Sequence, residues 1–364
     1  MALIARARSL TCISIFPLAI FAVAGCGATR DEGAEPTPAS QQAPLTVGVE
    51  ATTDPGPVPQ VVGGTNAALG QFPWQVQMGQ SGDPTLEQAT VFPHWCGASL
   101  ISPHYAVTAA HCVFGQNEVT FVLRMGIVQR SLAPSSAERI RGIHKITINP
   151  SYTTSTSWQT GNDVAVLELN EPVTFSTAVR PIALTLTDPP VGGSSTVSGW
   201  GRLVGFGAIP DILQSAPLPV QSAATCNTFF TGPTVLDNML CAGSGSGDTS
   251  SCNGDSGGPL VYRPNNTRPY DLVGIVSWGP TSCAAYSVFT RVTSQSSWIR
   301  SVATDAYLDG DVNLDGCVNS ADLSLVSASL GQPVPANVLV DQNNNGTVDT
   351  GDYLTVLANT GHGC

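Results

Sequence analysis

The stretch Gly-Asp-Ser-Gly-Gly-Pro at residues 254–259 places one serine, Ser256, among small residues. A serine hydroxyl is a weak nucleophile near neutral pH, so it needs an imidazole to accept its proton and a carboxylate to orient that imidazole. Two other stretches supply these groups: His111 in Thr-Ala-Ala-His-Cys, and Asp163 at the start of Asp-Val-Ala-Val-Leu. In the order His111, Asp163 and Ser256, the chain carries the three groups needed to attack an amide carbonyl.

These three stretches, in this order, resemble those of the trypsin/chymotrypsin-like serine proteases. The resemblance implies an endopeptidase in which Ser256 attacks the scissile bond, His111 accepts the serine proton and Asp163 orients His111. It also implies an oxyanion hole formed by the backbone N–H groups of Gly254 and Ser256, where one donor is worth about 3–4 kcal/mol. The expected partners are protein or peptide substrates, and no cofactor is expected for catalysis.

Two other functions fit the sequence less well. A lipase or esterase would need a serine on a strand–helix elbow and the chain order Ser, Asp, His, and this chain has neither. The alternative from another class is a calcium-dependent binding protein that uses a non-catalytic protease domain as a scaffold. The intact set of three catalytic groups argues against that alternative.

The resemblance predicts a substrate pocket without the carboxylate of tryptic members. Ser250 stands where those members carry Asp, so a substrate Arg or Lys has no partner. Ser287 stands where glycine is usual, which narrows the pocket and favours medium aliphatic side chains. We therefore expect loose specificity of the chymotrypsin/elastase kind, since one methylene is worth only about 1–3 kcal/mol. The predicted pocket residues are Ser250, Ser277, Trp278, Gly279 and Ser287.

Val-Val-Gly-Gly at residues 61–64 resembles the N-terminus of activated family members. Cleavage before Val61 would release an ammonium group that pairs with Asp255, and burial of such a charge is costly unless it is paired. Gln60 precedes the cut, where tryptic zymogens carry Arg or Lys. We therefore expect another protease to activate the chain.

The first 60 residues predict export followed by a tether. Arg6 and Arg8 precede a mostly apolar run at residues 10–24, which is too short to span a membrane comfortably and is typical of an export signal. Residues 23–26 resemble a lipobox, which predicts a lipoprotein anchored through Cys26 at the outer surface; the alternative is an ordinary signal peptide. Residues 27–60 are rich in proline and predict a disordered tether or propeptide.

The composition and the pattern of apolar runs indicate a mainly β protein. The chain holds 37 glycines and 27 prolines, and its short apolar runs, as at residues 164–169 and 272–276, are separated by turn residues. For residues 61–303 the resemblance implies two six-stranded antiparallel β-barrels with the active site between them. A short closing helix is expected at residues 294–302. The formal net charge of −12 argues against a nucleic-acid partner.

Ten cysteines fit an oxidising compartment, and two of them lie in the predicted signal. The resemblance implies three disulfides within the protease segment: Cys96–Cys112, Cys226–Cys241 and Cys252–Cys283. Cys317 and Cys364 remain, and we expect them to pair with each other; the alternative is two free or intermolecular thiols.

Residues 311–322 are echoed at residues 341–352. Positions 1, 3, 5, 9 and 12 of each stretch carry oxygen-bearing side chains and position 6 is glycine, which is the pattern of a calcium-binding loop. A backbone carbonyl is expected to serve at position 7. The predicted ligands of two Ca²⁺ ions are Asp311, Asn313, Asp315, Cys317, Asn319 and Asp322, and Asp341, Asn343, Asn345, Thr347, Asp349 and Asp352.

Aspartate at position 12, with only one helix following each loop, makes residues 304–364 resemble a type I dockerin. The expected fold there is a small α-helical calcium-loop domain. Two roles stay open for it. One is docking to a cohesin-type partner, and the other is a calcium-folded cap that stabilises the chain without a partner.

Overall fold

The computed structural model describes residues 63–80, 93–132, 135, 138–266, 268–334 and 337–364. The predicted export signal, the lipidated Cys26, the tether and the new N-terminus at Val61 lie outside these residues. In the described part of the chain, no helix is both long and apolar enough to cross a membrane.

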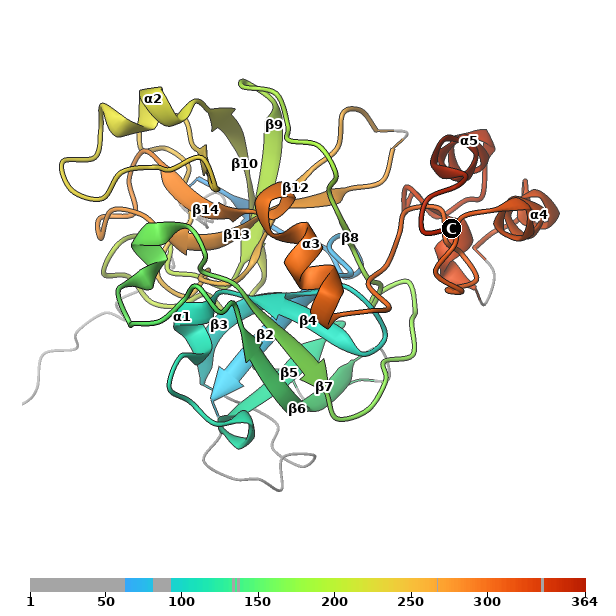
Figure 1. Ribbon diagram of the computed structural model, residues 1–364, viewed down its shortest axis with the longest axis horizontal. Coiled ribbons are helices and arrows are strands. Elements are labelled where there is room, and N and C mark those ends of the chain that lie inside the picture. Colours follow the sequence, from blue (N-terminus) through green and yellow to red (C-terminus); the bar gives the residue numbers. More distant parts are fainter. Residues whose placement is uncertain (1–62, 81–92, 133–134, 136–137, 267, 335–336) are drawn as a thin grey trace, which may run out of the picture. The chain divides into compact units, whose positions relative to one another are not determined.

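The first barrel is a closed ring of six antiparallel strands (Figure 1). Alternate side chains of its strands point inward, and Val76 and Met78 of one strand are fully buried there. Around the ring the strands are β2 (Gln75–Gln80), β3 (His94–Leu100), β4 (Tyr105–Thr108), β7 (Ala165–Leu169), β6 (Arg139–Ile148) and β5 (Phe121–Met125).

A second ring of six antiparallel strands closes when β9 pairs with both β10 and β12. Its strands, in order around the ring, are β9 (Ser194–Gly199), β10 (Gln214–Gln221), β11 (Met239–Ala242), β14 (Ser287–Arg291), β13 (Asp271–Trp278) and β12 (Pro259–Tyr262). Two strands of two residues lie outside the ring: β1 (Thr65–Asn66) pairs with β10, and β8 (Ala183–Leu184) pairs with β13. The predicted pair of six-stranded barrels is confirmed.

Short helices connect the strands. They are α1 (Ala110–Val113), α2 (Ala223–Asn227) and the 3₁₀ helices η2 (Glu118–Thr120) and η3 (Ser157–Thr160). The expected closing helix is α3 (Val292–Val302), two residues longer at its start than the sequence suggested. Its Val292 and Ile299 are fully buried and belong to the larger apolar core.

The C-terminal residues form α4 (Ser320–Ser329), the 3₁₀ helix η4 (Val338–Val340) and α5 (Thr350–Asn359). Each α-helix starts inside one of the duplicated stretches, at a capping box in which Asn319 or Asp349 is the N-cap, and the side chain of an aspartate three residues later accepts a hydrogen bond from the N-cap N–H. The helices bury valines of both repeats in one apolar cluster.

Four disulfides close the pairs expected from the sequence: Cys96–Cys112, Cys226–Cys241, Cys252–Cys283 and Cys317–Cys364. Each removes conformational freedom from the unfolded chain and is typically worth about 2–4 kcal/mol. Three of them brace the two barrels, and the fourth ties the first duplicated stretch to the end of the chain.

Candidate active site

Strand pairing brings His111 and Asp163 together. The end of β4 lies beside the start of β7, with Thr108 opposite Ala165. Because α1 begins two residues after the end of β4 and Asp163 lies two residues before β7, both His111 and Asp163 lie at the same end of the first barrel. The Asp163 carboxylate accepts two hydrogen bonds from His111, at 2.8 Å from the backbone N–H and 2.7 Å from Nδ1. The carboxylate therefore fixes Nδ1 as the protonated ring nitrogen.

The second barrel holds the buried carboxylate from its other side. Ser277 of β13 donates its hydroxyl to Asp163 Oδ2 at 2.6 Å, and Thr290 of β14 donates to the Asp163 carbonyl at 2.8 Å. Asp163 is fully buried. Sequence reasoning predicted Ser277 only as part of the substrate pocket and missed this hydrogen bond, which joins residues 114 positions apart.

The loop that carries Ser256 packs closely on the first barrel through glycines. The Ser256 carbonyl accepts a hydrogen bond of 2.8 Å from the N–H of Gly97 in β3. At Gly257, which has a φ of +76°, an added Cβ would lie 2.1 Å from Thr108 Oγ1. Only glycine fits so close a contact at a positive φ. These contacts place Ser256 beside the end of β4, from which His111 follows.

His111 and Ser256 line one cleft of about 470 Å³. In the described residues no hydrogen bond joins the two side chains directly, and in such sites this contact often tightens only when substrate is present. The other lining residues are Ser155, Trp158, Ser251, Cys252, Asn253, Val276, Ser277, Trp278, Gly279, Pro280, Thr281 and Cys283.

The predicted oxyanion donors are free of protein acceptors. In the described part of the chain neither the Gly254 nor the Ser256 backbone N–H makes a hydrogen bond, whereas the N–H groups of Asp255 and Gly257 do. Gly254 has a φ of +102°, which glycine adopts without strain. Its carbonyl accepts a hydrogen bond of 2.8 Å from His94 Nε2. Burial lowers the pKa of His94 to about 4, so this imidazole is neutral near pH 7.

Asp255 lies in a fully buried niche behind the oxyanion loop. Its two carboxylate oxygens accept hydrogen bonds from the N–H groups of Gly201 at 2.7 Å and Cys252 at 2.9 Å. Burial raises the pKa of Asp255 to about 6, because the ionised form is poorly solvated there. Its predicted partner, the ammonium group of Val61, lies outside the described residues, so the ion pair stays a prediction.

The predicted pocket residues divide into two groups. Ser277, Trp278 and Gly279 line the cleft. Ser250 and Ser287 are almost fully buried and are not part of its lining. The Ser250 hydroxyl donates to the Cys283 carbonyl at 2.5 Å, and the Ser287 hydroxyl accepts from the Ser251 N–H at 2.9 Å. Both serines therefore brace the backbone behind the cleft wall.

An aromatic group extends one wall of the cleft. The rings of Trp158 and Trp278 lie 5.7 Å apart, and Phe230 packs on Trp278 at 4.8 Å. Trp158 belongs to η3, in the loop that leads to Asp163. Sequence reasoning missed Trp158, because its position in a polar loop carries no signal of contact with β13.

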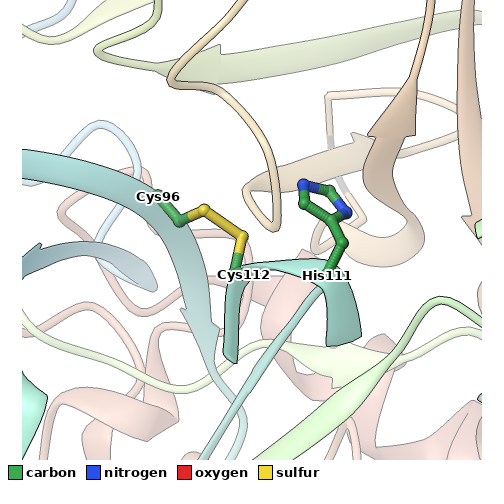
Figure 2. A group of neighbouring side chains, drawn as sticks. All are labelled: Cys96, His111 and Cys112. Carbon is green, nitrogen blue, oxygen red and sulfur yellow. A yellow bond between two sulfur atoms is a disulfide. The ribbon is translucent and has the colours of Figure 1, made fainter. Parts of the chain in front are cut away.

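Figure 2 shows His111 beside the Cys96–Cys112 disulfide. The three side chains offer ligand atoms within 4.8 Å of one another, a spacing that could suit a metal ion. The disulfide consumes both thiolates, so the group does not fit a metal. The disulfide instead links α1, which carries His111, to β3 of the first barrel.

The duplicated C-terminal stretches share several internal hydrogen bonds, and their oxygen-bearing side chains are of the type that binds calcium. Carboxylates at positions 1 and 12 are almost fully buried, and in the described residues none of them takes part in a salt bridge. Backbone N–H groups orient them: Gly316 donates to Asp311, and Gly346 to the equivalent Asp341, both at 2.9 Å. Buried carboxylates without a cationic partner are costly. A hard cation would supply that partner.

Two closed barrels, with a buried carboxylate, an imidazole and a serine where they meet, define a serine-protease site. A family model described as Trypsin matches residues 61–299. The chain is 35% identical over 250 residues to Trypsin-1 of Astacus astacus, which covers 67% of this chain and 100% of that protein.

Two further relatives agree. Fibrinolytic enzyme, isozyme C, of Lumbricus rubellus is 35% identical over 66% of this chain and 98% of its own length. Transmembrane protease serine 9 of Rattus norvegicus is 37% identical over 68% of this chain and 22% of its own length. The chain belongs to the trypsin family and is a serine endopeptidase.

Proposed function

We propose that His111, Asp163 and Ser256 are the catalytic groups of an exported endopeptidase. The observation that carries this proposal is the double hydrogen bond from His111 to the buried Asp163, in the cleft that Ser256 also lines. Export and lipid anchoring through Cys26 depend on residues outside the described part of the chain and remain predictions.

In the proposed mechanism the Ser256 hydroxyl attacks the scissile carbonyl and passes its proton to His111 Nε2. The Asp163 carboxylate stabilises the imidazolium that forms, through the hydrogen bond to Nδ1. The N–H groups of Gly254 and Ser256 donate hydrogen bonds to the developing oxyanion, which is why their freedom from protein acceptors in the described residues matters. His111 then gives the proton to the leaving amine, and water hydrolyses the acyl-enzyme by the same steps in reverse.

An active-site label tests this assignment. The chain cleaved before Val61 should react with a fluorophosphonate at one equivalent per molecule, because only an activated serine attacks phosphorus at a useful rate. Ser256→Ala should take up no label, while the buried Ser250→Ala should still react. Equal labelling of wild type and Ser256→Ala, measured by intact mass spectrometry, would remove Ser256 from the mechanism.

We further propose that specificity is of the chymotrypsin/elastase kind. In support, no Asp or Glu lines the cleft in the described residues, and the hydroxyl of the buried Ser250 donates to the Cys283 carbonyl. Ser287→Gly would remove the hydroxyl that accepts a hydrogen bond from the N–H of Ser251, a residue that lines the cleft, and would give this part of the wall room to move away from a large substrate side chain.

Peptide-library profiling checks this prediction. The wild type should prefer medium aliphatic side chains, and Ser287→Gly should raise kcat/KM for Phe or Tyr substrates relative to Leu by about tenfold. Ser222→Gly, a change at an exposed helix cap, serves as the control and should leave the profile unchanged. A strong preference of the wild type for Arg or Lys would overturn the proposed pocket.

We also propose that residues 304–364 bind two Ca²⁺ ions, through the ligand sets given above. Support comes from the buried carboxylates of both stretches, none of which forms a salt bridge in the described residues. Gly316 and Gly346 add to it, because their φ values of +85° and +90° make the turn at position 6. Docking of a cohesin-type partner remains a proposal, favoured by exposed leucines on α4 and α5: Leu325, Leu354 and Leu357.

A further inference from the structure

The two duplicated stretches differ at position 4, which is not a predicted calcium ligand. In the first stretch position 4 is Leu314, whose side chain is 39% exposed. In the second it is Asn344. Both residues have left-handed backbones, with φ values of 60° and 55°, so the two loops share one backbone shape at this point. Only the side chains, and what they contact, distinguish them.

Asn344 joins the second stretch to the protease segment. Its Nδ2 donates to the carbonyl of Gly70 at 2.9 Å, and its Oδ1 accepts from Arg180 Nη1 at 3.0 Å. A second nitrogen of Arg180, Nη2, donates to the carbonyl of Asp341 at 2.7 Å. In the described residues no hydrogen bond joins residues 311–322 to residues 63–303. The second stretch alone is fastened in this way.

Arg180 depends on this contact. Its side chain is only 5% exposed, and in the described residues no carboxylate lies within salt-bridge distance of it. A buried cation is costly without strong acceptors, so the two loop oxygens, together with the nearby charges of acidic groups that include Asp309, Asp341 and Asp352, favour the buried guanidinium. These two oxygens lie within hydrogen-bond distance of Arg180 only when the backbone from Asp341 to Asn344 keeps the conformation described here.

Apolar packing continues across the same region. Ala183 of the protease segment belongs to the apolar cluster of the C-terminal residues, and Phe175 packs against it; the cluster includes valines of both stretches, so apolar packing does not distinguish them. The N–H of Tyr307 donates to the carbonyl of Ile101 at 2.7 Å. Residues 63–364 accordingly fall within one compact unit.

We propose that the second calcium loop holds the C-terminal residues to the protease segment when calcium is bound, a role that we call the fastener. When an ion binds the carboxylate of Asp341 and the side chains on either side of Asn344, it holds the loop backbone in one conformation. In that conformation the loop makes its hydrogen bonds with Arg180 and Gly70. Calcium at this loop therefore orders the protease segments around Gly70 and Arg180, whereas the first loop makes no hydrogen bond to them in the described residues and its calcium orders neither segment. This inference rests on the proposed calcium binding.

Hydrogen exchange of the full chain, carrying Ser256→Ala to prevent self-digestion, tests the proposal. In Asp341→Ala, amides of residues 70–73 and 180–183 should exchange about tenfold faster than in the parent, with Ca²⁺ present. The matched variant Asp311→Ala should leave both segments unchanged and expose only its own loop and α4. Equal effects of the two variants, or no effect of Asp341→Ala, would overturn the fastener.

A milder variant separates ion binding from fastening. Asn344→Leu gives the second loop the residue that the first already carries at the same backbone angles, so it should keep both ions by native mass spectrometry. Faster exchange at residues 70–73 and 180–183 is expected all the same, and parental exchange rates would overturn the fastener alone. If the parent itself binds no calcium, the proposed calcium sites and the fastener both fail, while the proposed catalytic groups stand.

Discussion

Asparagine in place of Asp163 should lower kcat/KM about 10⁴-fold at neutral pH. Two donors of His111 and one of Ser277 converge on this carboxylate. An amide presents an N–H to the imidazole, which favours the tautomer protonated on Nε2. That tautomer cannot accept the proton of Ser256, and the amide cannot stabilise an imidazolium.

Ser277→Ala is the matched control for this experiment. It removes one donor to the same carboxylate and leaves His111 in place, so we expect a loss of about tenfold, in line with one charged hydrogen bond. Initial rates on a peptide substrate and thermal melting of each variant should be measured together. A loss below about 100-fold in a well-folded Asp163→Asn protein would show that the carboxylate does not serve the catalytic imidazole.

Chelation of calcium should unfold the C-terminal residues. With the ions removed, the buried carboxylates at positions 1 and 12 of each loop repel one another with no cation to offset that repulsion, and the loops that lead into α4 and α5 lose their ligand. We expect amide exchange in α4 and α5 to rise about 10³-fold or more when EGTA replaces Ca²⁺.

Strand β5, at residues 121–125 of the first barrel, provides the internal reference because it lies far along the chain from both loops and should keep its protection. The same measurement with Mg²⁺ in place of Ca²⁺ tests the choice of ion, since Mg²⁺ demands a smaller octahedral site. Unchanged exchange of α4 and α5 in EGTA would end the calcium assignment.

The short apolar runs of the sequence predicted a mainly β protein, and the resemblance of the stretches around His111, Asp163 and Ser256 implied the two barrels and the triad. In β2 the inward-pointing Val76 and Met78 alternate with glutamine and glycine, and the stretches around His111 and Ser256 are short enough to be recognised directly. The contact between Ser277 and Asp163 could not be predicted from such patterns. It depends on how the second barrel packs on the first, and a serine next to a tryptophan carries no mark of that packing.

The pocket shows a similar limit. The resemblance assigns Ser250 and Ser287 to the pocket by their distance along the chain from Ser256 and Cys283. That distance determines which loop each serine belongs to. It does not fix the side to which each hydroxyl turns. Hydrogen bonds to a backbone carbonyl and a backbone N–H decide that, and here they draw both side chains behind the wall. The duplicated loops likewise look equivalent in sequence, although only the one with Asn344 reaches Arg180.

Ring closure of both barrels bears on how this enzyme survives among its own products. In the described residues every strand of the two rings has a hydrogen-bonded neighbour on each side, and the outlying β1 and β8 are two residues long. Freshly cut peptides are extended and expose unpaired amide groups, so they readily form backbone hydrogen bonds with an exposed edge strand. Because so few strand edges are exposed in the described residues, peptide fragments have few places to pair with the enzyme and form intermolecular sheets. The enzyme should therefore stay dispersed in concentrated digests.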